Sequence, residues 1–289
     1  PAMYWPDVPG SMNGAKILSI AAQRPARTMS NDELPGKFDI DDAWIQSRTG
    51  IATRGVANAE ETLVEMSAGA ASKAIAEAGI DPATIDLTIV ATSSNPITTP
   101  GIAPPLTDRL GLTSGAFDIM AACAGCCYSV NVAADSIRAG SARNVLVVGA
   151  ERITDRMDWN DRNTCYLFGD GAGAAIISAT DVDDDGIGPV VWGSDGALAD
   201  YIAQPMDSPY LQMDGQAVFK WAITELAGFA REACEKAGIE PKDLAAFVPH
   251  QANLRIVESV ARNLGVGEST VVADDVRYSG NTSAASIPL

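Results

Sequence analysis

The sequence has a single histidine among its 289 residues, and this scarcity argues against a metal site built from nitrogen and sulfur ligands. A structural zinc ion takes about four such ligands. The five cysteines do not supply them, because Cys165 and Cys234 lie far along the chain from Cys123, Cys126 and Cys127. An odd and bunched set of cysteines is also unlike a secreted disulfide framework. We therefore predict free thiols in a reducing compartment and no metal.

Basic residues and long apolar runs are scarce as well. The sequence has 20 Lys and Arg residues and 37 Asp and Glu residues, so its net charge is −17. This charge disfavours general binding to nucleic acid or anionic lipid. No apolar run approaches the roughly 20 residues of a membrane span, and residues 1–12 lack the basic and apolar regions of a secretory signal. The 47% hydrophobic content suffices for one large core or two fused smaller ones. These features predict a cytoplasmic globular protein, with residues 1–14 as an N-terminal extension or a cloning remnant.

An internal repeat organises the rest of the chain. Ala-Gly-Ile-Asp-Pro at 78–82 and Ala-Gly-Ile-Glu-Pro at 237–241 each follow a stretch with helical apolar spacing and precede a short apolar run. A glycine that caps a helix and a proline that stops it explain both. Arg-Leu-Gly-Leu at 109–112 and Asn-Leu-Gly-Val at 263–266 then close a second helical segment in each copy. The pattern indicates two helix–strand–helix–strand units, with chance similarity as the alternative because Ala-Gly-Ile is common at helix ends.

Helices that alternate with short Val-rich and Ile-rich strands, such as residues 144–149, indicate an α/β fold with largely parallel sheets covered on both faces. Ligands bind such sheets at the carboxyl ends of the strands. Cys123, His250 and Asn281 all fall at such ends. These three residues are therefore the first candidates for chemistry.

Cys123 lies where a predicted strand runs into a small-residue helix that ends near Gly140. The amides and the dipole at a helix N-terminus favour a thiolate, so we expect a lowered pKa for the Cys123 thiol. Two other interpretations stay open. One is a small buried cysteine without chemistry, and the other is a Cys-x-x-Cys redox pair with Cys126.

His250 and Asn281 each have a structural interpretation beside the chemical one. His250 follows the strand-like residues 245–248 and a proline, at a point where a strand opens into a loop. Asn281 opens a helix from the turn at Gly280. A lone histidine is usually structural or exposed, and an asparagine in this position is usually a helix N-cap. A role in chemistry for either residue depends on its neighbours.

Those neighbours carry a family resemblance. Residues 121–125 (Ala-Ala-Cys-Ala-Gly), 249–255 (Pro-His-Gln-Ala-Asn-Leu-Arg) and 280–284 (Gly-Asn-Thr-Ser-Ala) resemble the Cys, His and Asn motifs of β-ketoacyl-acyl-carrier-protein synthase III, a condensing enzyme of the thiolase superfamily. Residues 42–51 and 168–174 support the likeness, which runs from about residue 16 to the end of the sequence.

The resemblance implies a thiolase-like fold, in which two duplicated α/β halves form a layered αβαβα core. Residues 15–180 would form the N-terminal half with the nucleophilic cysteine, and residues 181–289 the C-terminal half with the histidine and the asparagine. Family members continue past the Asn motif through a helix and strands to a glycine-rich loop, so we expect the second half to be incomplete at its end. The link at 204–210 is also shorter than the family usually shows.

The resemblance also implies a transferase that needs no cofactor, with a coenzyme A thioester as its substrate. Cys123 would take an acyl group from acyl-CoA and then condense it with malonyl-acyl-carrier protein by decarboxylation, which initiates fatty acid biosynthesis. His250 and Asn281 would hydrogen-bond the malonyl thioester oxygen and stabilise the enolate. A homodimer is expected from the same likeness. The alternatives are a secondary-metabolism relative that primes polyketides or transfers acyl groups, and a catalytically silent binding or scaffold homologue.

Trp44 and Arg48 are four residues apart, so on a helix they share one face. An indole suits adenine and a guanidinium suits phosphate, although a surface aromatic beside a solvated arginine is the plainer interpretation. The resemblance implies that Trp44, Arg48 and Arg162 contact coenzyme A and that Asn253 contacts the pantetheine arm.

Arg255 and Arg262 lie seven residues apart on one face of the helix predicted after His250. Two such residues are usually only solvated. In an acidic protein, however, a local basic spot beside the active-site entrance suits an acidic carrier protein. We expect Lys220, Gln251, Arg255 and Arg262 to form the carrier-docking surface.

Residues 96–100 resemble a segment that, in the family, reaches towards the acyl pocket of the other subunit. Acetyl-primed bacterial relatives can carry a bulky aromatic just before the proline, where this chain has Thr99. We therefore expect Thr99 and Phe168 to line an acyl pocket that accepts primers longer or more branched than acetyl. The alternative is that Thr99 only shapes the turn before Pro100.

Overall fold

The computed structural model describes residues 14–35 and 38–289. Of the predicted extension at 1–14, all but Gly14 lies outside these residues. In chain order the strands and helices are β1 (Gly14–Gln23), β2 (Thr28–Ser30), α1 (Asp42–Thr49), β3 (Thr53–Gly55), α2 (Leu63–Ala78), β4 (Leu87–Ala91), α3 (Ala103–Leu110), β5 (Gly115–Ile119), α4 (Gly125–Arg138), β6 (Asn144–Arg152), β7 (Asp170–Thr180), β8 (Ile202–Ala203), β9 (Gln212–Met213), α5 (Gly215–Ala237), β10 (Ala246–Phe247), α6 (Leu254–Leu264), β11 (Val271–Val272) and α7 (Val276–Ser279). Within the described part of the chain, no helix is long and apolar enough to cross a membrane.

The main sheet has five strands in the order β1-β7-β6-β4-β5. β4 runs parallel to β5 and β6, whereas β7 runs antiparallel to β6 and β1. The expectation of a largely parallel sheet is therefore wrong for its β7 side. Parallel neighbours need a crossover helix, which α3 and α4 supply, but residues 153–169 between β6 and β7 contain only a short 3-10 turn. The chain consequently returns in the opposite direction.

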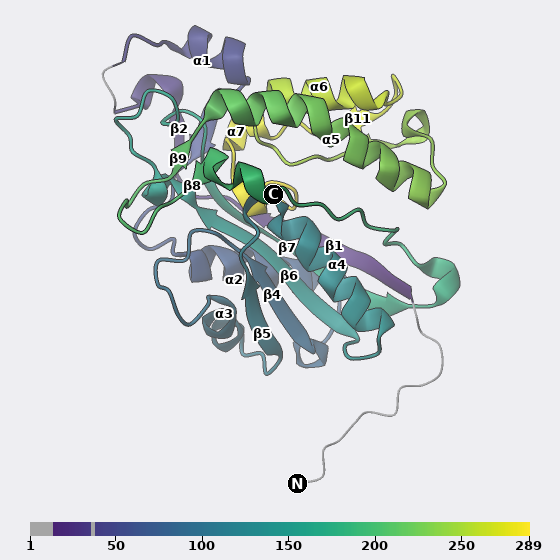
Figure 1. Cartoon of the computed structure of the whole chain (residues 1–289). Coiled ribbons are helices and arrows are strands. Elements are labelled where there is room, and N and C mark those ends of the chain that lie inside the picture. The colour runs from purple at the N-terminus through teal and green to yellow at the C-terminus, as the bar shows by residue number, and fades with distance from the viewer. Residues whose placement is uncertain (1–13, 36–37) are drawn as a thin grey trace.

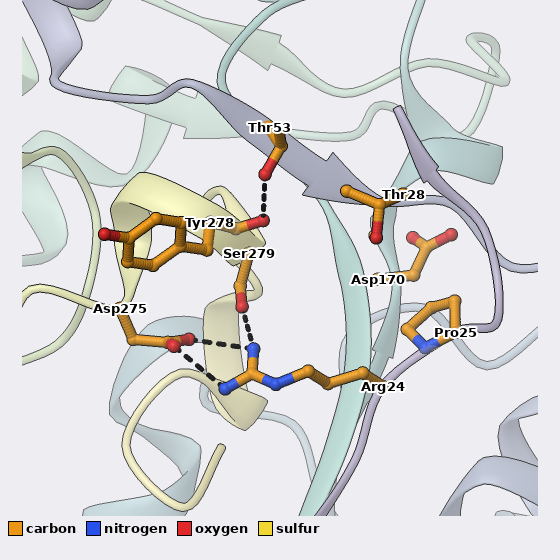
Figure 2. Close-up of a pocket in the computed structure, with 9 residues that line it drawn as sticks. Arg24, Pro25, Thr28, Thr53, Asp170, Asp275, Tyr278 and Ser279 are labelled. Atoms are coloured by element: carbon orange, nitrogen blue, oxygen red, sulfur yellow. Dashed lines mark hydrogen bonds and ion pairs between the residues drawn. The ribbon is translucent and has the colours of Figure 1, made fainter. Parts of the chain in front are cut away.

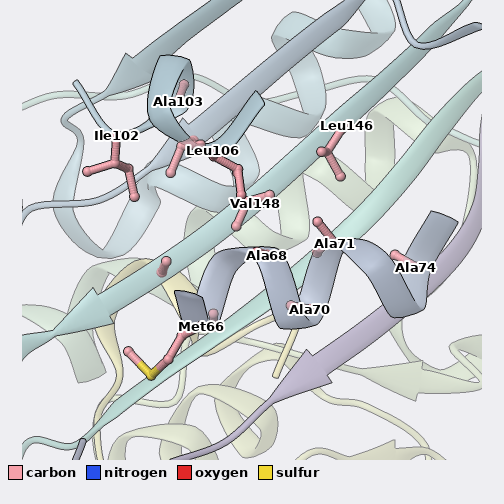
Figure 3. Close-up of a cluster of buried hydrophobic side chains, with 14 of the residues drawn as sticks. Met66, Ala68, Ala70, Ala71, Ala74, Ile102, Ala103, Leu106, Leu146 and Val148 are labelled. Carbon is pink, nitrogen blue, oxygen red and sulfur yellow. The ribbon is translucent and has the colours of Figure 1, made fainter. Parts of the chain in front are cut away.

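Helices cover both faces of this sheet (Figure 1). The side chains of β6 alternate between the faces, because successive residues of a strand point to opposite sides. Leu146 and Val148 join a buried cluster with α2 and α3, which Figure 3 shows, while Val145 and Val147 join a second cluster with α4. Burial on both faces explains why residues 145–150 of β6 are all apolar rather than alternating.

The predicted helix–strand–helix–strand repeat is confirmed. The first copy is α2-β4-α3-β5 and the second is α5-β10-α6-β11, and the two strands of each copy pair in parallel. Gly79 and Gly238 end the first helix of each copy in the left-handed conformation, as Gly111 and Gly265 end the second. Only glycine adopts this conformation without strain, which is why the repeat is visible in the sequence. The boundary between residues 180 and 181 stays a prediction.

Residues 281–289, which follow the second copy, connect it to the main sheet. α5 and α6 lie side by side above the sheet in Figure 1. Residues 281–289 pack against β6 and β7, where Gly149 and Gly173 allow the two backbones to approach closely. A Cβ at Gly149 would lie 2.3 Å from the Ala284 carbonyl oxygen, and one at Gly173 would lie 2.6 Å from the Pro288 backbone. A side chain at either position would therefore push the two backbones apart.

Candidate active site

Cys123 occupies the strand-to-helix junction that the sequence predicts. β5 ends at Ile119, a 3-10 turn spans Ala122–Ala124, and α4 begins at Gly125. Ala122 has a φ of 43° and Ser283 a φ of 46°, and these are the non-glycine residues with positive φ in the described part of the chain. The two strained turns meet at Cys123, whose Sγ lies 3.8 Å from the Ser283 Oγ. Strain of this kind gathers at functional sites.

The expected low pKa of Cys123 is wrong. Burial raises the pKa of the Cys123 thiol to about 11, the Ser283 hydroxyl opposes the rise, and the negative charge of Glu151 adds to it. Loss of water around the sulfur therefore outweighs the favourable end of α4. At neutral pH the unliganded site holds a thiol rather than a thiolate.

Glu151 is a feature of the site that the sequence analysis missed. It is the penultimate residue of β6 and is 0% exposed, and its carboxylate accepts hydrogen bonds from the backbone N–H of Ser93 at 3.1 Å and from the Ser93 hydroxyl at 2.9 Å. The hydroxyls of Thr92 and Ser94 donate to the same group. Burial raises the pKa of Glu151 despite these donors. The carboxylate fixes the loop after β4 against β6, beside Cys123.

His250 follows β10 and is held from its Nδ1 side. Its Nδ1 lies 2.7 Å from the Ser286 Oγ. Burial lowers the pKa of the His250 imidazole to about 4, so the ring is neutral at physiological pH. A neutral imidazole carries one N–H donor, and which nitrogen bears it decides what the residue can do.

Gln251 does not lie on a docking surface. It is 2% exposed, its side-chain amide donates to the carbonyls of Pro249 and Ala273 at 3.0 and 3.1 Å, and its Oε1 accepts from the Val276 backbone N–H at 3.1 Å. The expectation that Gln251 contacts a carrier protein is therefore wrong. Its amide instead ties the His250 loop to the start of α7.

Asn281 is held so that its amide nitrogen is available as a donor. Its backbone pairs with residues 167–169, where its N–H donates to the Leu167 carbonyl at 2.8 Å and its carbonyl accepts from the Gly169 N–H at 3.1 Å. The side-chain Oδ1 accepts from the Ser283 backbone N–H at 2.9 Å. With the oxygen occupied, the Nδ2 group is the part of the side chain left for a ligand.

One short segment, residues 281–286, joins the three predicted catalytic residues. Asn281 belongs to it, its Ser283 contacts Cys123, and its Ser286 contacts His250. A sulfur nucleophile, a neutral imidazole and an amide donor thus share one network at the ends of β5 and β10. Such a set can form a thioester and place two hydrogen-bond donors on an oxygen that gains charge.

The three residues predicted to contact coenzyme A also come together. Trp44 and Arg48 lie on α1, and the Arg48 guanidinium carbon is 4.5 Å from the centroid of the Trp44 ring. The guanidinium carbon of Arg162 is 5.3 Å from the same centroid. Tyr166, which the sequence analysis missed, packs edge-on against Trp44 with centroids 5.6 Å apart. Asn253 caps α6 and its Nδ2 donates to the Arg48 carbonyl at 3.4 Å, which links α6 to α1.

The remaining predicted residues lie in different surroundings. Lys220 on α5 and Arg255 and Arg262 on α6 are exposed, and the guanidinium carbon of Arg255 lies 5.2 Å from the ring centroid of its α5 neighbour Phe219. Thr99 lies on an exposed loop before α3. Phe168, by contrast, is buried and bridges to Asn281.

A separate cavity of about 420 Å³ lies between the loop after β1 and α7 (Figure 2). Arg24 crosses it and donates to both carboxylate oxygens of Asp275, at 2.8 and 3.1 Å. Thr53 donates to the Tyr278 carbonyl at 2.7 Å on its far side. None of the predicted site residues lines this cavity. The ion pair fixes α7, and with it the segment that follows α7, against the N-terminal half.

Comparison with known proteins agrees with this geometry. Residues 117–196 match the family described as 3-oxoacyl-[acyl-carrier-protein (ACP)] synthase III, and residues 234–289 match the C-terminal part of the same family. A β-ketoacyl-[acyl-carrier-protein] synthase III of Streptomyces coelicolor is 46% identical over 278 residues, which cover 96% of this chain and 88% of that protein.

Solved structures are similar over nearly the whole chain. The priming β-ketosynthase of a polyketide biosynthetic pathway superposes with a TM-score of 0.92 at 42% identity, covering 100% of this chain and 88% of that one. A 3-oxoacyl-[acyl-carrier-protein] synthase III of Aquifex aeolicus superposes with a TM-score of 0.89 at 38% identity, covering 95% of this chain and 88% of that one. These likenesses confirm the predicted thiolase-like fold class. The chain belongs to the β-ketoacyl-[acyl-carrier-protein] synthase III family.

Proposed function

We propose that this protein is an acyltransferase that condenses an acyl-CoA primer with malonyl-acyl-carrier protein, with loss of carbon dioxide, and so initiates fatty acid synthesis in the cytoplasm. The observation that carries the proposal is the network through residues 281–286, which joins Cys123, His250 and Asn281. The name of the Streptomyces coelicolor relative supports the choice of reaction.

In the first half-reaction the Cys123 sulfur attacks the thioester carbon of acyl-CoA. A new carbon–sulfur bond forms to Cys123 and the bond to the coenzyme A sulfur breaks. Since burial raises the pKa of Cys123 to about 11, the thiol is still protonated when acyl-CoA binds. That proton leaves with the coenzyme A thiol, so no external acid or base is consumed.

In the second half-reaction the malonyl thioester oxygen lies between two neutral donors, the Nε2 of His250 and the Nδ2 of Asn281. The bond between the malonyl α-carbon and its carboxylate breaks and carbon dioxide leaves. The electron pair of that bond forms an enolate, whose negative charge lies on the thioester oxygen. The donors are most effective at this point, because they are fixed before charge develops. The enolate carbon attacks the acyl carbonyl, the bond from that carbon to the Cys123 sulfur breaks, and Cys123 departs as a thiolate. The thiolate takes one proton from solvent, which replaces the proton that left with coenzyme A.

Coenzyme A would bind at the aromatic and cationic cluster of α1. Two guanidinium groups, of Arg48 and Arg162, lie within 4.5 and 5.3 Å of the Trp44 ring centroid. Adenine can replace one guanidinium on the indole, which frees that cation for a phosphate. Asn253 lies between α6 and α1, where the pantetheine arm would pass towards Cys123.

The carrier protein and a second subunit would bind at two further surfaces. Lys220, Arg255 and Arg262 offer exposed positive charge on α5 and α6 in a protein whose net charge is −17, so an acidic carrier would be guided to that face. β5 is an edge strand of the main sheet and its Phe117 is 40% exposed. An unpaired edge with an exposed aromatic suits pairing with a second copy, as in a homodimer.

Polyketide priming is a second candidate, and the likeness to a priming β-ketosynthase favours it. Condensation assays with malonyl-acyl-carrier protein across acetyl-, isobutyryl- and octanoyl-CoA distinguish the two by primer choice. A catalytically silent scaffold would instead gain no acyl group from any primer.

Mass spectrometry after incubation with acyl-CoA tests the nucleophile directly. One acyl adduct should form on the peptide that contains Cys123 and should be absent from Cys123→Ser, because a hydroxyl lacks the nucleophilicity of the thiol. Cys127→Ser is the matched control, since Cys127 lies in the first turn of α4, four residues after Cys123, and is exposed. An adduct that survives in Cys123→Ser and disappears in Cys127→Ser would overturn the assignment.

A further inference from the structure

Ser286 lies behind the imidazole of His250 and has no place in the reaction described above. It follows the 3-10 turn Ser283–Ala285 and is 4% exposed. Its Oγ lies 2.7 Å from the His250 Nδ1 and 3.2 Å from the backbone nitrogen of Gln251. The hydroxyl therefore has two polar neighbours, one of which is the ring whose proton position matters.

The direction of these two hydrogen bonds follows from their partners. The Gln251 backbone N–H can only donate, so the Ser286 oxygen accepts from it. The hydroxyl hydrogen then needs an acceptor, and among the residues that the structure describes His250 Nδ1 is the other atom within hydrogen-bond distance. If Nδ1 instead carried the proton and donated to Ser286, the buried hydroxyl hydrogen would be left without an acceptor. Buried donors in proteins are seldom left in that state.

We infer that Ser286 is a positioning residue, whose hydroxyl donates to Nδ1 of His250 and thereby holds the imidazole proton on Nε2. The ring is neutral because burial lowers the pKa of His250 to about 4, so it has a single N–H donor to place. With the proton on Nε2, that donor is on the side of the ring away from Ser286. The chemical value of this arrangement rests on the proposed function, but the tautomer itself does not.

The same segment orients the second donor by the same principle. The Ser283 backbone N–H occupies Oδ1 of Asn281 at 2.9 Å, which leaves Nδ2 as the ligand-facing group. In both residues a protein donor occupies the acceptor atom, so the remaining hydrogen-bonding group is a donor. Residues 281–286 thus occupy the acceptor atoms of His250 and Asn281 and leave each of them an N–H donor, which suits an oxygen that becomes negative.

The single histidine of the chain makes the tautomer directly measurable. In protein labelled with ¹⁵N-histidine, one imidazole gives all the ring signals, and two-bond proton–nitrogen correlation spectra distinguish a protonated from a bare nitrogen. We expect a bare Nδ1 and a protonated Nε2 in the unaltered enzyme. Ser286→Ala should lose this pattern and show Nδ1 protonated in part or in full, whereas Ser286→Thr, which keeps the hydroxyl, should retain it.

Thr282→Val is the matched control for these spectra. Thr282 is in the same segment and its buried Oγ1 has no hydrogen-bond partner in the described part of the chain. Valine replaces that hydroxyl by a methyl group of nearly the same size, so the tautomer should stay as in the unaltered enzyme. A protonated Nδ1 in the unaltered enzyme, or an unchanged pattern in Ser286→Ala, would overturn the inference.

Kinetics separate this inference from the proposed function. Ser286→Ala should acylate at the unaltered rate and decarboxylate more slowly, by less than the roughly 10²-fold that follows deletion of a whole oxyanion donor, because a fraction of the rings keeps the Nε2 proton. If the unaltered enzyme shows the expected tautomer but neither acylates nor condenses, the proposed function fails and the role of Ser286 stands. If the unaltered enzyme condenses but the His250 tautomer does not change in Ser286→Ala, the proposed function stands and the role of Ser286 fails.

Discussion

Gly149→Ala tests whether residues 281–286 control the geometry of the whole site. Gly149 lies in β6 beneath this segment, and a Cβ there would come within 2.3 Å of the Ala284 carbonyl oxygen. The obstructing atom is backbone, so it cannot swing aside as the end of a flexible side chain can. The segment must therefore lift by about one ångström to restore van der Waals contact.

The expected magnitude has a stability part and a rate part. Overpacking a close-packed core costs about 1–3 kcal/mol, so the free energy of unfolding should fall by that amount. A misplacement of about 1 Å at a reacting centre can cost roughly 10²-fold in rate. Because the segment contacts Cys123 and His250 and contains Asn281, acyl transfer and malonyl decarboxylation should slow together.

The assay combines urea unfolding with separate measurements of the two half-reactions on folded protein. Gly228→Ala in α5 is the matched control, since a Cβ there meets nothing within 4 Å. It should gain about 0.5–1 kcal/mol from the better helix former and keep both rates. A Gly149→Ala protein that is as active as the unaltered one in both half-reactions would refute the view that this segment sets the site.

Four further predictions concern single groups. His250→Ala and Asn281→Ala should still form the acyl-enzyme but release carbon dioxide from malonyl-acyl-carrier protein roughly 10²-fold more slowly, since each loses one donor to the enolate oxygen; normal decarboxylation in both would remove their assigned role. Arg255→Glu should raise the KM for malonyl-acyl-carrier protein at low salt and spare acylation by acyl-CoA, because rim charges act mainly on encounter; an unchanged KM would place the docking surface elsewhere. Thr99→Phe should raise kcat/KM for acetyl-CoA relative to octanoyl-CoA, since each buried methylene is worth about 1 kcal/mol; a strong acetyl preference before mutation would show that the pocket is already short. Burial raises the pKa of the Asp170 carboxyl to about 6, so the native state binds the carboxyl proton more tightly than the unfolded state does. The stability that this protonation contributes is therefore lost as the pH rises through about 6. In Asp170→Asn the free energy of unfolding should depend less on pH between about pH 4 and pH 6, and an unchanged slope there would contradict the assignment.

Local chemistry made the repeat and the helix ends predictable. Gly79 and Gly238 end helices because they adopt a conformation that other residues avoid, and such positions leave a mark in the sequence. The direction of β7 left no such mark, because an apolar run reads the same whether its strand is parallel or antiparallel. Direction was decided by the connection at 153–169, which contains no crossover helix.

The sequence motifs pointed to residues that the structure joins in one network, but they did not predict the pKa values of those residues. The motifs located Cys123, His250 and Asn281, and the spacing of Trp44 and Arg48 located the aromatic and cationic cluster. The pKa of Cys123 moves upward because folding removes water from the sulfur, and no local pattern encodes how much.

The surroundings of three polar residues also could not be predicted from local sequence. Gln251 is buried although it is polar and adjacent to His250 in sequence, because its amide pairs with backbone groups from two other segments. Glu151 and Ser286 were missed because a glutamate at a strand end and a serine after a helical turn are common. Only the tertiary structure shows that one approaches the nucleophile and the other the imidazole.

The most direct test of the account follows a single acyl group through both half-reactions. The enzyme is loaded with acyl-CoA, freed of excess donor, and then mixed with malonyl-acyl-carrier protein while intact-protein and peptide masses are recorded. We expect one acyl group on Cys123 that disappears as β-ketoacyl-acyl-carrier protein and carbon dioxide form in equal amounts. An acyl group that stays on Cys123 while carbon dioxide is released, or one that never forms there, would contradict it.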